Sequence, residues 1–87
     1  MKIIYGQPGQ RPTQVCEVDD DAGSFGSGRG VISGADAYAK VLALGDRALA
    51  YGFHVQLGSR LFEQCQIRRV EGHTISVEYR EESARDD

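Results

Sequence analysis

Residues 33–52 read SGADAYAKVLALGDRALAYG and carry the clearest helical pattern in the chain. Ser33 can cap this helix, and Asp36 three positions later gives an acidic variant of the capping box. Gly52 is placed to take the left-handed conformation that ends many helices. We therefore predict one helix over residues 35–51. Its core-facing positions follow the i, i+3, i+4 rule and are Tyr38, Val41, Leu42, Gly45, Ala48 and Leu49.

A second apolar seam runs along the same predicted helix. A helix that is apolar around most of its girth must be covered on more than one side. Two explanations are open: the glycine-rich residues before the helix fold over the seam, or the seam contacts a partner. In the second case the contact would be centred on Leu44 and Tyr51, and a homodimer is one form of it. The seam comprises Ala37, Val41, Leu44, Ala48 and Tyr51.

Short apolar runs on both sides of the helix predict β-strands. The first two cover residues 2–5 and 13–18, with a proline–glycine turn at residues 7–10 between them. After the helix, residues 53–57 alternate apolar and polar side chains, as expected of a strand with one solvated face. We predict one domain over residues 1–87 with the order β-β-loop-α-β-β-β. This is an α+β fold with one helix packed on a mostly antiparallel sheet.

The last two predicted strands form a hairpin whose register can be argued from its apolar positions. A three-residue loop at residues 71–73 pairs Ile67 with Val77 and Cys65 with Tyr79, and keeps the apolar side chains on one face. Residues 82–87 are polar, and we expect a frayed tail there. The outer face of the hairpin would carry Gln64, Gln66 and Arg68 opposite Arg80, Glu78 and Ser76.

Residues 19–34 combine an acidic run with many glycines. Three aspartates precede a segment with four glycines in the eight positions 23–30. Because glycine loses the most conformational freedom on folding, such a segment resists regular structure. We predict a mobile surface loop in which Phe25 is the one large apolar side chain.

Composition excludes several classes of protein. The chain has 87 residues, a net charge of −3 and 40 % hydrophobic residues, which is typical of a small globular domain. No apolar run approaches the roughly 20 residues of a membrane helix, and no secretion signal is recognisable. The cysteines are Cys16 and Cys65 alone. A single bridge between them is geometrically open, but two reduced thiols are favoured, and we expect a cytoplasmic protein.

The motifs of common enzymes and cofactor sites are absent. The glycines at 23–30 fit neither a phosphate-binding loop nor a dinucleotide fingerprint, and Asp19–Asp21 do not continue into an EF-hand pattern. Zinc sites need clustered Cys or His ligands, whereas His54 and His73 are single. We therefore expect a protein that is not an enzyme, with no catalytic residues, no cofactor and no metal.

Surface contacts are the remaining source of function. An acidic run from Glu17 to Asp21 could occlude a basic or nucleic-acid-reading surface of another protein by charge complementarity. In size and composition the chain is similar to the small phage proteins that inhibit host defence complexes, including anti-CRISPR proteins. This resemblance implies a protein or ribonucleoprotein partner. The candidate partner-binding residues are Glu17, Asp19, Asp20, Asp21, Phe25, Arg29, Leu44, Arg47 and Tyr51.

The alternative is a nucleic-acid-binding or structural accessory module that uses the arginine-bearing C-terminal hairpin. Arginine forks suit phosphates, but glutamates interleave these arginines and stacking aromatics are scarce. The acidic pI, near 5.3, also argues against direct nucleic-acid binding. The arginines concerned are Arg60, Arg68, Arg69 and Arg80.

Overall fold

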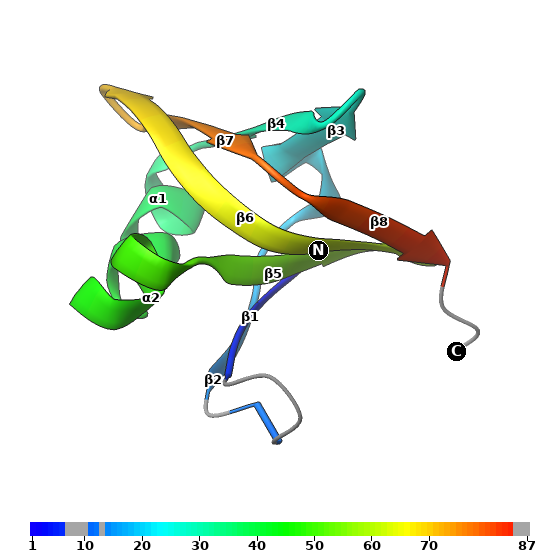
Figure 1. The fold of residues 1–87 in the computed structure, drawn as a ribbon. Helices are drawn as coiled ribbons and strands as arrows, with labels where there is room; N and C mark the ends of the chain where they lie inside the picture. The colour runs from blue at the N-terminus through cyan, green and yellow to red at the C-terminus, as the bar shows by residue number, and fades with distance from the viewer. Residues whose placement is uncertain (7–10, 13, 85–87) are drawn as a thin grey trace.

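The computed structural model describes residues 1–6, 11–12 and 14–84, so the predicted turn at residues 7–10 lies outside the described residues. The α+β class is confirmed, with every strand pair antiparallel (Figure 1). The elements are β1 (Lys2–Tyr5), β2 (Gln14–Glu17), the 3-10 turn η1 (Asp20–Ala22), β3 (Gly23–Gly26), β4 (Arg29–Ser33), α1 (Ala35–Leu42), α2 (Asp46–Tyr51), β5 (Phe53–Leu57), β6 (Arg60–Glu71), β7 (Thr74–Glu78) and β8 (Glu81–Ala84).

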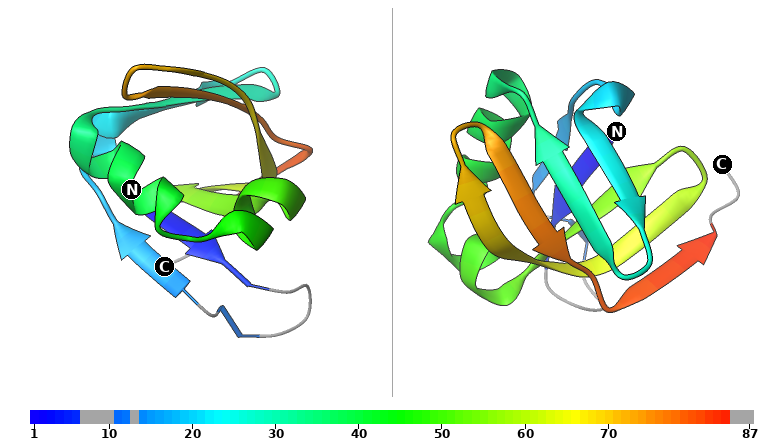
Figure 2. Two further views of the ribbon diagram at one scale, coloured as in Figure 1. Left: turned by 90° about the vertical axis from the view of Figure 1, so that its left-hand side faces the viewer. Right: turned by 90° about the horizontal axis from the view of Figure 1, so that it is seen from above.

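The sheet folds over on itself along β6. Its strand order is β2-β1-β5-β6-β7-β4-β3, and β8 also pairs with β6. The first half of β6 pairs with β5 and β8, in the part of the sheet that we call the first leaf. The second half of β6 pairs with β7, in the part that we call the second leaf. The second leaf lies above the first, and the helices lie across the end that faces the viewer (Figure 2, left).

Two β-bulges allow β6 to serve both leaves. Phe53 pairs with Cys65 but Val55 pairs with Phe62, so His54 faces two residues of β6. One of them, Gln64, has a φ of 55°, a left-handed conformation that is rare outside glycine. A second register shift lies between Ile67 and Arg69. Because bulges bend and twist a strand, these two positions redirect β6 from one leaf to the other.

The single predicted helix is broken into two. α1 ends at Leu42, and α2 begins after Gly45, which has a φ of 96° and not a helical value. The helical spacing that placed Gly45 in the core stripe therefore does not continue across it. Gly34, not Ser33, precedes α1, and no side chain caps it. The predicted end is confirmed: Gly52 has a φ of 106°, and its N–H donates to the Ala48 carbonyl.

The glycine-rich segment forms a hairpin, which corrects the prediction of a loop over residues 19–34. β3 and β4 are joined by Ser27 and Gly28, both with positive φ, as a type I′ turn requires. Gly30 packs under the Phe25 ring, where an added Cβ would overlap the ring carbons. Glycine at this position therefore serves packing between two strands, which composition alone does not reveal.

The C-terminal hairpin keeps one predicted pair and loses another. Ile67 pairs with Val77 as predicted. Glu71 pairs with Thr74, so the loop has two residues and not the predicted three. The bulge between Ile67 and Arg69 takes up the extra residue and brings Ile67 opposite Val77. Cys65 pairs with Phe53 and not with Tyr79. Residues 82–84, predicted as the start of a frayed tail, instead belong to β8, which pairs with β6, and residues 85–87 lie outside the described residues.

The core lies between the two leaves and under the helices. Phe62 is fully buried, and its ring centroid lies 4.5 Å from Phe25 and 4.8 Å from Tyr79. No helix among residues 1–6, 11–12 and 14–84 has the length and apolar character needed to cross a membrane. The other fully buried large side chains are Ile3, Ile32, Val41, Phe53, Val55, Ile75, Val77 and Cys65.

The two thiols differ in exposure, and we expect them to differ in reactivity. Both are free; Cys16 is half-buried on the edge strand β2, whereas Cys65 is fully buried and its burial raises the pKa of its thiol to about 12. Because the thiolate is the reactive form, Cys65 should react with Ellman's reagent at least about 100-fold more slowly than Cys16 at mildly alkaline pH. A Cys16→Ser variant isolates Cys65, and rapid labelling of that variant in the folded state would contradict the assignment.

Candidate functional site

The predicted partner-binding residues do not form one surface. Phe25 is 9 % exposed and stacks on Phe62, and Leu44 is 5 % exposed in the break between α1 and α2. Phe25 lies in the core because the glycine-rich segment forms a hairpin, and Leu44 lies there because the helix breaks beside it; neither feature was predicted. This corrects their assignment to a contact surface, and a homodimer centred on Leu44 loses its main apolar residue.

The acidic residues remain exposed and form a groove with the first turn of α1. Asp19, Asp21 and Asp36 line a depression of about 290 Å³ between η1 and α1, which we call the acidic groove. Asp36 pairs with Lys40 at 3.2 Å, and the amino group of Met1 pairs with the neighbouring Asp20. Within the described part of the chain, Asp19 and Asp21 make no ion pair. The groove therefore has two uncompensated carboxylates.

The open edge of β2 runs directly into this groove. Met1 and Val18 exchange both backbone hydrogen bonds, each of 2.9 Å. By the alternation of antiparallel pairs, the backbone groups of Val15 and Glu17 point away from β1. The Glu17 carbonyl accepts a hydrogen bond of 2.7 Å from Lys40 Nζ. Val15 is 53 % exposed on this edge. Such an edge can pair with a strand from another protein.

The four arginines predicted for nucleic-acid binding are dispersed. Arg60 donates two hydrogen bonds to the Glu82 carboxylate, at 2.9 and 3.2 Å. This bidentate pair raises the pKa of the Arg60 guanidinium and lowers the pKa of the Glu82 carboxyl. Arg68 pairs with Glu78 at 3.4 Å, and Arg69 pairs with Glu71. Arg80 is exposed in the connection between β7 and β8. Most of these charges are therefore neutralised locally.

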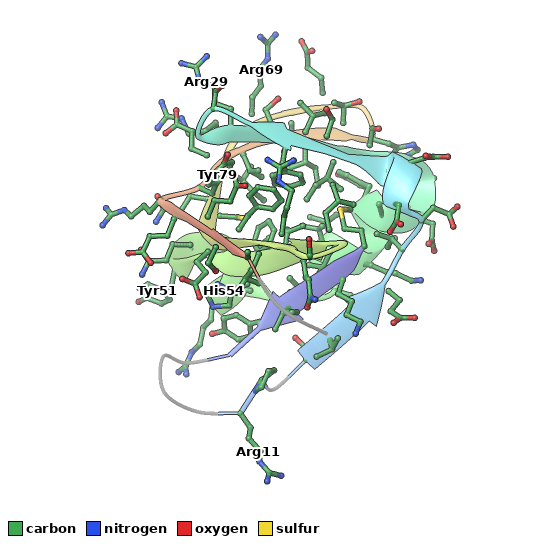
Figure 3. The ribbon with its side chains drawn as sticks, turned by 90° about the vertical axis from the view of Figure 1, so that its right-hand side faces the viewer. Arg11, Arg29, Tyr51, His54, Arg69 and Tyr79 are labelled. Carbon is green, nitrogen blue, oxygen red and sulfur yellow. The ribbon has the colours of Figure 1, made fainter. Side chains whose placement is uncertain are left out.

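Arg29 joins the outer face of the second leaf. It lines a shallow groove of about 350 Å³ together with Arg68, and Glu78 lies between them on β7. Figure 3 shows Arg29 and Arg69 projecting from this leaf, far from Tyr51 and His54. The face is of mixed charge, as the alternation of arginine and glutamate predicts.

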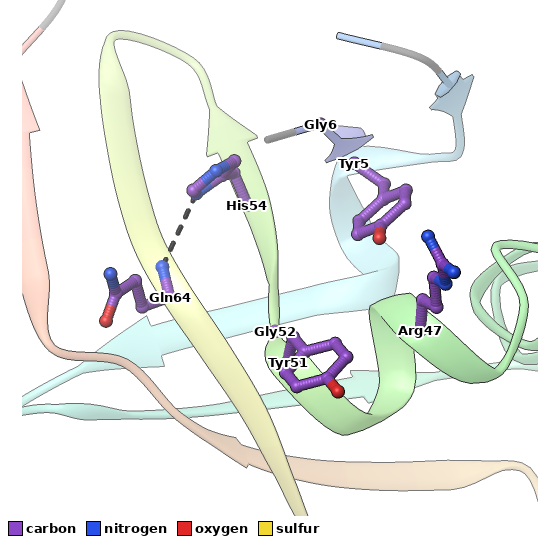
Figure 4. Close-up of a pocket in the computed structure, with 7 residues that line it drawn as sticks. All are labelled: Tyr5, Gly6, Arg47, Tyr51, Gly52, His54 and Gln64. Atoms are coloured by element: carbon purple, nitrogen blue, oxygen red, sulfur yellow. Dashed lines mark hydrogen bonds between the residues drawn. The ribbon is translucent and has the colours of Figure 1, made fainter. Parts of the chain in front are cut away.

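Arg47 and Tyr51 lie together in a pocket of about 390 Å³ (Figure 4). They are one turn apart on α2 and thus share a face of that helix. Sequence reasoning missed the other side chains, because β1, β5 and β6 bring them in from distant positions. The remaining lining residues are Tyr5, Gly6, Gly52, His54 and Gln64.

The bulge in β6 places a backbone N–H against the histidine in this pocket. The backbone N–H of Gln64 donates to His54 Nδ1 at 3.4 Å. This contact occupies Nδ1, so Nε2 is the ring nitrogen that can meet a ligand. The pocket thus combines a guanidinium, an imidazole and two tyrosine rings.

In the described residues, no group of three or more His, Cys, Asp or Glu side chains could hold a metal ion. No family model, no curated protein and no solved structure matches this chain, so its function has to be argued from these surfaces.

Proposed function

We propose that this protein is a small binding protein that acts by contact with another protein or ribonucleoprotein complex and catalyses no reaction. In its most specific form, the proposal is an inhibitor similar in kind to the phage-encoded anti-CRISPR proteins. Such an inhibitor would cover a basic or nucleic-acid-reading surface of its target. The supporting surface is the acidic groove with the adjoining edge of β2.

One observation carries the proposal: Asp19 and Asp21 are exposed without an ion-pair partner among the described residues, beside an unpaired strand edge. Uncompensated surface charge speeds encounter with a partner of opposite charge and disfavours partners of like charge. The open edge can then supply directional backbone hydrogen bonds. A basic protein surface satisfies both requirements, whereas a nucleic acid would be repelled.

We also propose that the protein acts in the cytoplasm. Cys16 and Cys65 are both unbridged, which is the usual state in reducing compartments.

The test is capture from a host lysate followed by binding kinetics. A stoichiometric protein or ribonucleoprotein complex should survive nuclease treatment. In the Asp19→Asn/Asp21→Asn variant, association with the purified partner should slow by roughly tenfold at low salt and much less at high salt. Both substitutions are on exposed side chains, so the fold should be unaffected.

A matched control removes the same charge elsewhere. Glu63→Gln/Glu81→Gln also removes two carboxylates that make no ion pair among the described residues, but these face each other across β6 and β8, and neither lines the groove. Equal slowing in both variants would show that net charge, not the acidic groove, governs association. Recovery of nucleic acid, with all captured proteins lost on nuclease digestion, would contradict the proposal. It would favour the alternative, a nucleic-acid-binding module that uses the arginine-bearing hairpin.

A further inference from the structure

We propose that the pocket between β1, α2, β5 and β6 binds a nucleotide, with the base stacked on Tyr51 and the phosphate held by Arg47 and His54. The pocket is separate from the acidic groove, because β1 runs between them. Met1 contacts Asp20 at the start of β1, whereas Tyr5 lines the pocket at its end. The proposal is therefore independent of the proposed function.

The charge of the pocket selects an anion. None of its described lining residues is a carboxylate, although the chain carries thirteen acidic residues. Arg47 makes no ion pair within residues 1–6, 11–12 and 14–84, in contrast to Arg60, Arg68 and Arg69, which each have a glutamate. An unpaired guanidinium presents a planar fork of donors that matches phosphate oxygens.

His54 lines the same pocket. Because His54 Nδ1 accepts the Gln64 N–H, Nε2 is the ring nitrogen that remains to contact a ligand. This hydrogen bond depends on Gln64 at its φ of 55°, and Gly52 lines the pocket beside it at a φ of 106°. A Cβ on Gly52 would come within 3.3 Å of the Cys65 carbonyl oxygen. The Gln64 N–H in the bulge therefore orients the imidazole, and the end of α2 packs closely against the same stretch of β6.

The rings select a flat partner. Tyr51 is 77 % exposed, the most exposed large hydrophobic side chain of the described chain, and Tyr5 lines the same pocket (Figure 4). Base–tyrosine stacking tolerates any base, because each has an apolar face. The volume of about 390 Å³ lies in the range of roughly 300–1,000 Å³ typical of small-ligand pockets. A nucleoside monophosphate combines the flat ring and the anion that these side chains require.

The test is an NMR titration of the whole protein with AMP, with adenosine and inorganic phosphate as half-ligands. AMP should bind saturably with shifts at Tyr51 and His54, and each half-ligand should bind at least tenfold more weakly. Tyr51→Ala and Arg47→Gln should each weaken AMP at least tenfold. Tyr51→Phe keeps the ring and should retain binding, while Arg69→Gln removes an arginine from the other leaf and should have no effect.

A comparison of AMP with the dinucleotide ApA distinguishes a free nucleotide from a nucleotide within a strand. Tighter binding of the dinucleotide ApA than of AMP would assign the pocket to a nucleotide unit within a single strand, and equal binding to a free mononucleotide. The proposal is overturned if millimolar AMP and ApA give no saturable shifts, or if the Arg47 and Tyr51 variants bind like the unchanged protein. Thermal melts of these exposed-site variants confirm that the fold is intact.

Discussion

The variant Val77→Asp should be unfolded at room temperature. Val77 is 2 % exposed and lies on β7 between Gly30 of β4 and Ile67 of β6. Burying an unpaired carboxylate costs several kcal/mol, or requires the group to stay protonated. A domain of this size has about 5–15 kcal/mol of stability in total, so one such change removes most of it. Circular dichroism melts and amide NMR spectra measure the loss directly.

The neighbouring Ser76→Asp is the matched control for this prediction. Ser76 is half-buried on the opposite face of the same strand and pairs with Arg69. A carboxylate there stays solvated near arginines, so we expect a change within about 0.5 kcal/mol. If Val77→Asp melts cooperatively near the temperature of the unchanged protein while Ser76→Asp does not, the inward and outward faces of β7 have been assigned the wrong way round.

The second large effect is expected at a glycine. Gly30→Ala should destabilise the fold by about 1–3 kcal/mol, because the added methyl group overlaps the Phe25 ring and forces it off Phe62. The inward row across the second leaf runs Phe25, Gly30, Val77 and Ile67, and only a residue without a side chain leaves room for the ring. Urea denaturation measures the change in the free energy of unfolding.

Gly26→Ala tests whether this effect is specific. Gly26 lies on the same hairpin, but a Cβ there meets nothing within 4 Å, so stability should change by no more than about 0.5 kcal/mol. In a Phe25→Ala background the clash is absent, and Gly30→Ala should then cost much less than in the unchanged protein. Equal costs in the two backgrounds would show that Phe25 is not the residue that Gly30 accommodates.

The candidate surfaces were only partly predictable. The exposure of Asp19 and Asp21 follows from their charge, because burying either would be costly. Tyr51 was named from the second apolar seam, and the structure adds that Arg47, one turn earlier on α2, lines the same pocket. His54 and Gln64 could not be linked to them, because their meeting depends on the bulge opposite His54. Leu44 was misplaced because Gly45 interrupts the helical spacing used to assign its direction.

The sequence by itself determined the α+β class, the strands at β1, β5 and β7, the Ile67–Val77 pair and the end of α2 at Gly52, because these depend on local periodicity and on the conformational range of single residues. Only the tertiary structure decided that residues 23–33 form a hairpin, that residues 81–84 pair with β6, and that the helix breaks at Gly45. These features depend on contacts between distant positions. A glycine that makes room for Phe25 and a glycine in a loop look identical in composition, and only the partner ring distinguishes them.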